Sequence, residues 1–232
     1  MGLSVRKHYF VVANAVLICC CCGLLAQNPQ LRTKNAGQFP TVVFTSVLWS
    51  ADPAYYSIAI DSSGAATYLS APDSIGKTGV PYTIEFQASE RTRRMVFNVA
   101  QRLDFADSSA PDSVPSPEKT SVRTLSYTDD HSSNQFSYTT PSGADLEELT
   151  SVLEELSETF EYGRKLAYLQ QQNDRSGIDS QLEHLQSLME RHHLREFQAL
   201  APVLRRVSSD GRLNAGTRSQ AEKLLLAAQQ SH

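Results

Sequence analysis

The side chains best suited to chemistry lie in two short polar segments. Asp129, Asp130 and His131 place two carboxylates beside an imidazole, and these residue types serve in general acid–base catalysis. His192 and His193 form the only adjacent histidine pair in the sequence. Adjacent helical residues point about 100° apart, so these imidazoles cannot share a metal ion as histidines four residues apart do. Asp129, Asp130, His131 and His192 are therefore the candidate catalytic residues, and no metal site is predicted.

The other requirements of an enzyme are poorly met. A hydrolase also needs an activated nucleophile and an oxyanion site, and the chain has no Gly-x-Ser-x-Gly motif. Gly76-Lys77-Thr78 is not a phosphate loop, because Ala71 stands where that motif requires glycine. A calcium loop around Gly177 would need an acidic first position, where Gln172 stands. The residues predict no cofactor and favour a non-catalytic protein over an enzyme.

Composition limits the class of protein. The chain has 232 residues, of which 41% are hydrophobic and 20% charged, which is a globular composition. Its net charge of −4 argues against a general nucleic-acid binder, because such proteins are normally basic. No nucleic-acid partner is therefore predicted.

The first 26 residues have the three parts of a secretory signal. Arg6 and Lys7 give a basic start, and the chain from Phe10 to Leu25 is apolar apart from an asparagine and a glycine. Ala26 then precedes a polar run, which places the predicted cleavage between Ala26 and Gln27. All four cysteines, at positions 19–22, would leave with the signal, so the sequence predicts an exported protein without disulfides, either periplasmic or secreted.

Two alternatives to a cleaved signal stay open. A lipoprotein signal requires a small residue before the lipidated cysteine, whereas Ile18 precedes Cys19. An uncleaved anchor requires about 20 apolar residues, a few more than this segment has. The only predicted contact with a membrane is through an uncleaved signal.

The rest of the chain divides by the period of its apolar residues. After a polar leader at 27–40, β-branched and aromatic residues alternating in twos predict strands, and Asp61–Gly64 predicts a hairpin turn. Apolar residues recur at helical spacing after Ser89, a predicted N-cap, and again after Ser142. The predicted fold is α+β: an antiparallel sheet with a packed helix at 41–162, followed by an all-helical C-terminal extension at 163–232.

The helix after Ser142 is the longest predicted element. Ser142 and Asp145 have the spacing of a capping box, which predicts that the helix starts there. Leucines recurring every three or four residues from Leu146 to Leu156 predict a buried face, and acidic residues cluster near the N-terminus. The extension is predicted to hold further helices, the last one around Ala221–Ala228.

The order of these elements resembles a family of uncharacterised exported bacterial proteins. The resemblance rests on the Gly-turn hairpin Tyr56–Tyr68, the short helix ending at Leu103-Asp104-Phe105, the strand Thr124–Asp129 and the Leu-rich helix Leu146–Leu156. It covers about Tyr55–Phe160 and implies a βββαββα-type domain of unknown function, followed by a Leu-rich helical tail. It implies export and carries over no catalytic residue.

The sequence therefore predicts an exported cell-envelope protein, a non-catalytic binding or structural module. Its partner would be a protein or another component of the envelope. The alternative is an extracytoplasmic hydrolase that uses an Asp/His site. That alternative requires at least two of the four candidate residues to converge in one cleft.

Overall fold

A computed structural model describes residues 39–48, 51–71, 81–103 and 121–230. The predicted signal at 1–26, its cleavage point at Ala26 and Gln27, and nearly all of the leader at 27–40 lie outside the described residues. Export and cleavage therefore stay predictions.

Six strands form a single antiparallel sheet. They are β1 (Thr41–Val47), β2 (Tyr55–Asp61), β3 (Ala65–Ala71), β4 (Tyr82–Gln87), β5 (Val122–Thr128) and β6 (Ser133–Tyr138), in the order β4-β3-β2-β1-β5-β6. Helix α1 (Glu90–Arg102) connects β4 to β5, and α2 (Ala144–Gln172) follows β6. The predicted α+β class is confirmed, and so is the helical C-terminal region.

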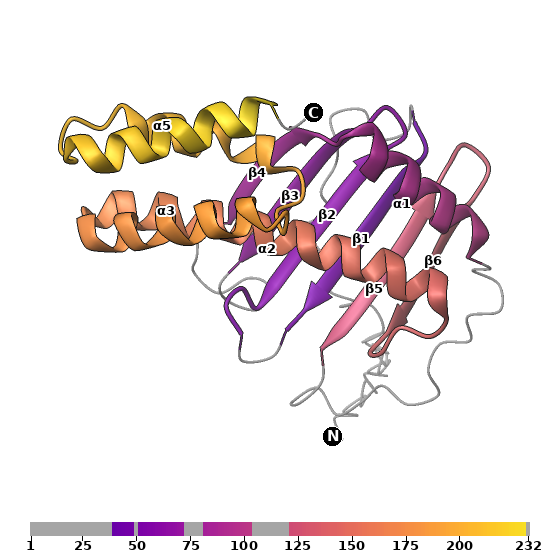
Figure 1. Cartoon of the computed structure of the whole chain (residues 1–232). Coiled ribbons are helices and arrows are strands. Elements are labelled where there is room, and N and C mark those ends of the chain that lie inside the picture. The colour runs from indigo at the N-terminus through magenta and orange to yellow at the C-terminus, as the bar shows by residue number, and fades with distance from the viewer. Residues whose placement is uncertain (1–38, 49–50, 72–80, 104–120, 231–232) are drawn as a thin grey trace, which may run out of the picture. The chain divides into compact units, whose positions relative to one another are not determined.

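One face of the sheet carries the large apolar side chains. Phe44 lies opposite Ile58 on one side and Leu125 on the other, and Ile58 in turn pairs with Tyr68. All four side chains are at most 1% exposed. Helices α1 and α2 both pack on this face (Figure 1), where the ring of Phe160 from α2 lies 5.0 Å from that of Tyr68. Successive side chains of a strand point to opposite faces of the sheet, so the large apolar ones gather on one face and form the core beneath the two helices.

The N-terminus of α1 is capped as predicted. The Ser89 hydroxyl accepts the Thr92 N–H at 3.3 Å, which satisfies one of the unpaired donors at the start of the helix. Glu90 in the first turn and Arg102 in the last have the signs that the helix dipole favours.

The predicted capping box of α2 is wrong. The helix begins at Ala144, and its N-cap is Gly143, whose φ of 85° turns the chain without a side-chain cap. Asp145 is engaged elsewhere, because the Arg102 guanidinium donates to both of its oxygens, at 2.7 and 3.2 Å. An ion pair between α1 and α2 therefore replaces the local reciprocal contact with Ser142.

Helix α2 continues past the sheet and organises the C-terminal helices. These are α3 (Arg175–Glu190), the 3₁₀ helix η1 (Phe197–Leu200), α4 (Ala201–Ser208) and α5 (Ala215–Gln230). Figure 1 shows α3 and α5 beyond the β4 edge of the sheet. No break in α2 occurs at residues 162–163, where the boundary was predicted, and one apolar core includes both Leu149 and Leu204. None of the helices in the described part of the chain is long and apolar enough to cross a membrane.

Gly163 allows α2 to approach η1 closely. A Cβ atom at this position would lie 2.7 Å from Leu200 Cδ2 and 2.9 Å from the hydroxyl oxygen of Tyr82. At an exposed helical site, replacing glycine by alanine stabilises a protein by about 1 kcal/mol.

At Gly163 we expect alanine to destabilise the protein instead. Gly163→Ala should lower the free energy of unfolding by about 1–2 kcal/mol, because the added Cβ would overlap the Leu200 side chain, which is fully buried and would have to shift. Urea denaturation measures the change. Gly216→Ala is the matched control, because the nearest atom to a Cβ there is the side-chain oxygen of Asn214, at 3.1 Å. Equal effects of the two substitutions would contradict the close approach at Gly163.

Buried tyrosines give the fold a predictable response to alkali. Burial raises the pKa of Tyr56 to about 12 and holds those of Tyr68 and Tyr82 well above the usual 10.0, with the Glu161 carboxylate adding to the effect at Tyr68 and Tyr82. A raised folded-state pKa means that the unfolded chain loses its protons first. This contribution to stability is complete below pH 10 and is lost as the pH rises toward 12.

We therefore expect the protein to unfold in alkali as its buried tyrosines ionise. Tyrosinate absorbance and far-ultraviolet circular dichroism, recorded against pH on the same sample, should show the main tyrosine ionisation together with loss of helix. Complete ionisation of the tyrosines while the dichroism stays native would contradict the expectation.

Candidate functional site

Asp129 shapes the turn between β5 and β6. Its Oδ1 accepts the backbone N–H groups of His131 and Ser132, both at 2.8 Å. These two donors hold the pKa of the Asp129 carboxyl below its usual range. The contact with His131 is made by the backbone and not by the imidazole. Asp129 thus closes a turn, and Asp130 and His131 are exposed beside it.

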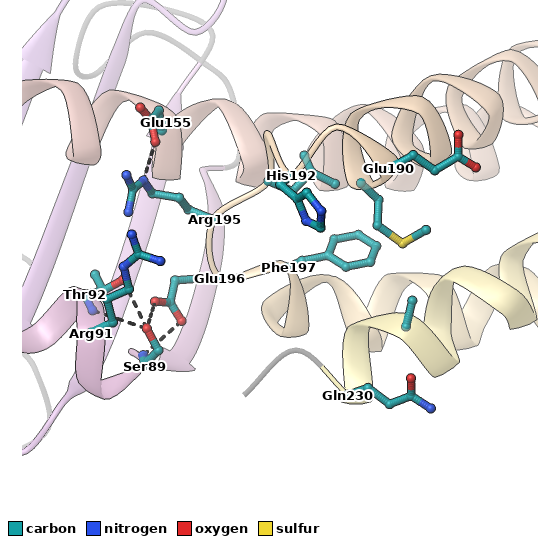
Figure 2. Close-up of a pocket in the computed structure, with 13 residues that line it drawn as sticks. Ser89, Arg91, Thr92, Glu155, Glu190, His192, Arg195, Glu196, Phe197 and Gln230 are labelled. Atoms are coloured by element: carbon teal, nitrogen blue, oxygen red, sulfur yellow. Dashed lines mark hydrogen bonds and ion pairs between the residues drawn. The ribbon is translucent and has the colours of Figure 1, made fainter.

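His192 lies in a different place. It is an exposed residue just after α3, with a φ of 58°, and it lines a cleft of about 650 Å³. We call this the junction cleft: its walls come from the first turn of α1, the middle of α2, the segment 189–197 and the last turn of α5 (Figure 2). Asp129, Asp130 and His131 are not among its lining residues. The structure does not bring the four candidates into one cleft.

The most buried charged residue of the junction cleft is Glu196. Glu196 is only 7% exposed, and it adopts a left-handed backbone conformation with a φ of 51°. Its two oxygens accept the Ser89 hydroxyl at 2.6 Å and the Ser89 N–H at 3.0 Å, and the Gln198 amide donates to it as well. Glu196 thereby supplies the anion that the N-terminus of α1 favours.

A second contact fixes the adjacent wall. The Arg195 guanidinium pairs with the Glu155 carboxylate of α2, as Figure 2 shows. The backbone N–H of Arg195 donates to the Thr159 hydroxyl at 3.2 Å, and that hydroxyl donates to the backbone carbonyl of Glu155 at 3.0 Å. Arg195 and Glu196 therefore tie the segment after α3 to α2 and to α1 respectively.

The Ser89 hydroxyl of the junction cleft is engaged by its neighbours. The Ser89 hydroxyl donates to Glu196 and accepts the Thr92 N–H, so it serves as a helix cap. Within the described ranges no imidazole is hydrogen-bonded to Ser89, although an activated serine needs such a base. No group of three or more His, Cys, Asp or Glu side chains that could hold a metal ion occurs among the described residues.

The groups that face solvent around the cleft have mixed charge. Arg91, Glu190, His192 and Gln230 are exposed, and Figure 2 shows them coming from α1, α3, the segment after α3 and α5. Phe197, which is buried, and Leu194 and Met189, which are half-buried, supply apolar surface. A polar rim with apolar surface between its members is the usual composition of a binding cleft.

Sequence reasoning found His192 but missed the two residues that build the cleft. Arg195 and Glu196 stand in a charged stretch with no motif, and their partners Glu155 and Ser89 lie 40 and 107 residues away. The one available signal was local: Ser89 was recognisable as a helix start, and a helix N-terminus favours a nearby carboxylate. Nothing in the sequence specified which carboxylate.

Comparison with known proteins identifies no family. No protein-family model matches the chain, and no curated protein matches its sequence. The resemblance to uncharacterised exported bacterial proteins therefore stays a prediction.

Proposed function

We propose that this protein is an exported, non-catalytic binding module of the cell envelope, and that its partner binds in the junction cleft. The partner is a protein or another envelope component. The observation that carries the proposal is the pairing of Ser89 with Glu196 and of Arg195 with Glu155. Both pairs hold the walls of an open cleft in place while the exposed rim faces solvent.

Size and composition support binding. A volume of about 650 Å³ is within the range of pockets that take a small ligand or a few side chains of a partner. Rim groups of both signs suit a partner with complementary charges better than they suit one simple ion. The hydrolase alternative has less support, because Asp129 is engaged by its own turn and His192 lies in a different site.

Export is supported by the sequence of the first 26 residues. A basic start, an apolar segment and Ala26 before Gln27 are the parts of a signal peptide. Mass spectrometry of the protein purified from its native cells tests this part of the proposal. A mature chain starting at Gln27 is expected, and an intact Met1 in the cytoplasmic fraction would contradict export.

Site-specific photo-crosslinking tests the binding site. A photoreactive amino acid is placed at His192 in the full chain, which is then expressed in its native envelope and irradiated. A discrete adduct is expected at this position. The matched control places the same amino acid at Asp130, which is exposed in the β5–β6 turn, and no such adduct should form there. Equal adducts at both positions, or none at His192, would contradict the proposed site.

A further inference from the structure

The outer edge of β4 lies beside a groove of about 390 Å³. Strand β4 is one end of the sheet, so within the described ranges only β3 pairs with it (Figure 1). Glu85 and Gln87 line the groove from β4, and Ala199 and Pro202 line it from η1 and α4. We call it the β4 groove. Ser89 lines both this groove and the junction cleft, but nothing in the proposed function uses the edge of β4.

The register of β4 determines where its backbone groups point. The Ala88 N–H donates to the Gly64 carbonyl at 2.8 Å, so the backbone groups of Ala88 are directed toward β3. Backbone groups alternate in direction along an antiparallel strand, so those of Gln87 and Glu85 are directed away from β3. No backbone hydrogen bond joins β4 to η1 or α4 in the part of the chain that the structure describes. The donors and acceptors of Glu85 and Gln87 therefore lie along the open edge.

An open edge of this kind is a template for another strand. Proteins often protect such an edge with lysine, proline or a bulge, because its backbone groups can pair with any extended chain. Strand β4 contains neither lysine nor proline, and its pairing with β3 runs without a bulge from Tyr82 to Gln87. The β4 groove thus presents the groups that an extended peptide uses when it adds to a sheet.

One side of this edge is apolar. Phe86 points to the face of the sheet that the helices cover, where its ring lies 4.8 Å from that of Phe160. Phe86 and Ala199, which are half-buried, and Pro202, which is exposed, supply apolar surface to the groove. In a strand added beside β4, every second side chain would lie on the same face as Phe86. Apolar residues suit these positions.

The other side of the edge carries a negative charge. Glu85 precedes Phe86 and therefore points to the opposite face of the sheet. It is exposed, its neighbour on β3 is Thr67, and no ion pair engages it among the residues described. Glu90, which also lines the groove, is already paired with Arg94. Because opposite charges stabilise neighbouring strands, a basic side chain suits the position beside Glu85.

We propose that the β4 groove binds an extended peptide segment of a partner protein, which adds to the sheet as a strand beside β4. The backbone of the segment exchanges hydrogen bonds with Glu85 and Gln87. Its side chains alternate between basic residues on the face of Glu85 and apolar residues on the face of Phe86. This surface is separate from the edge-free walls of the junction cleft, and the inference does not depend on what binds there.

The test uses the full chain and a synthetic peptide, acetyl-Lys-Val-Lys-Val-Lys-amide. Hydrogen exchange of single backbone amides is followed by nuclear magnetic resonance with and without the peptide. Exchange at Glu85 and Gln87 should slow about 10-fold or more, because their N–H groups gain acceptors. Exchange at 191–197, in the junction cleft, should not change. A peptide with glutamate in place of each lysine is the charge control and should bind about 10-fold or more weakly.

Methylation of the peptide nitrogens separates strand pairing from simple attraction between charges. In an antiparallel strand, the lysine N–H groups point to β4 and the valine N–H groups point away from it. Methylating the lysine nitrogens should therefore abolish binding, whereas methylating the valine nitrogens should leave it nearly unchanged. The reverse pattern indicates a parallel strand and also supports the proposal. Equal binding of the two methylated peptides overturns it.

Variants of the protein test the same contact from the other side. Glu85→Pro removes an outward donor without removing a hydrogen bond to β3, and it should weaken binding about 10-fold or more. Glu85→Gln keeps the donor and should weaken binding only about 2- to 5-fold, while Glu183→Gln, at an exposed carboxylate of α3, should not weaken it. The proposal is overturned if the peptide at about 1 mM leaves exchange at Glu85 and Gln87 unchanged. It is equally overturned if Glu85→Pro, with wild-type circular dichroism, binds as wild type does.

Discussion

Phe160→Ala is expected to lower the free energy of unfolding by about 3–5 kcal/mol, the largest effect of any single substitution considered. The Phe160 side chain is fully buried, and its ring lies 5.0 Å from that of Tyr68 and 4.8 Å from that of Phe86. It therefore joins α2 to β3 and β4. Truncation removes this contact area and leaves a cavity that neighbours in the sheet cannot fill.

The way in which the variant unfolds is as informative as the size of the loss. Because α2 packs on the sheet and also against α3, η1 and α4, the sheet and the C-terminal helices should still unfold together. Near- and far-ultraviolet circular dichroism in urea should give coincident transitions. Phe160→Leu serves as the control, with a smaller loss of about 1–2 kcal/mol. A loss below about 1 kcal/mol in Phe160→Ala, or helices that persist after the sheet has unfolded, would contradict this account.

Glu196→Ala is expected to cost about 2–4 kcal/mol, the second largest effect. The substitution leaves the half-buried N–H and hydroxyl of Ser89 and the amide of Gln198 without their shared acceptor. Urea denaturation gives the stability. Hydrogen exchange should show faster exchange in the first turn of α1.

Glu196→Gln separates the carboxylate from the shape of the side chain. Glutamine retains one acceptor oxygen, so it should preserve part of the contact with Ser89 and cost less than alanine does. A matched substitution on the neighbouring wall, Glu155→Gln, breaks a half-exposed ion pair and should cost at most about 1 kcal/mol. If Glu196→Ala cost no more than Glu155→Gln, Glu196 would not be the residue that holds the segment after α3 against α1.

The parts of the fold that depend on neighbouring residues were predictable from the sequence. The hairpin turn is one example: Asp61 Oδ1 accepts the N–H groups of Ser63 and Ala65, and Gly64 has a φ of 89°. The Ser89 cap is another. In both cases side chain and backbone lie within four residues of each other, so residue type and spacing are enough to indicate the contact.

The parts that depend on distant residues were not predictable. The capping box at Ser142 failed because Arg102, 43 residues before Asp145, takes that carboxylate. Glu196 could not be assigned to Ser89 for the same reason. His192 could be recognised as a candidate by its residue type, but its membership of the junction cleft depends on how α1, α2, α3 and α5 meet. Contacts of this kind follow from packing and not from a local pattern.

The proposed function requires that a partner occupies the junction cleft without being chemically changed. Hydrogen exchange followed by mass spectrometry tests it most directly, on the full chain mixed with the purified partner that is identified by crosslinking at His192. Exchange is expected to slow in peptides that cover Ser89–Thr92 and Arg191–Phe197 and to stay unchanged in the β5–β6 hairpin, while the mass of the partner stays constant. Slowed exchange confined to the β5–β6 hairpin, or a partner cleaved during incubation, would contradict the claim.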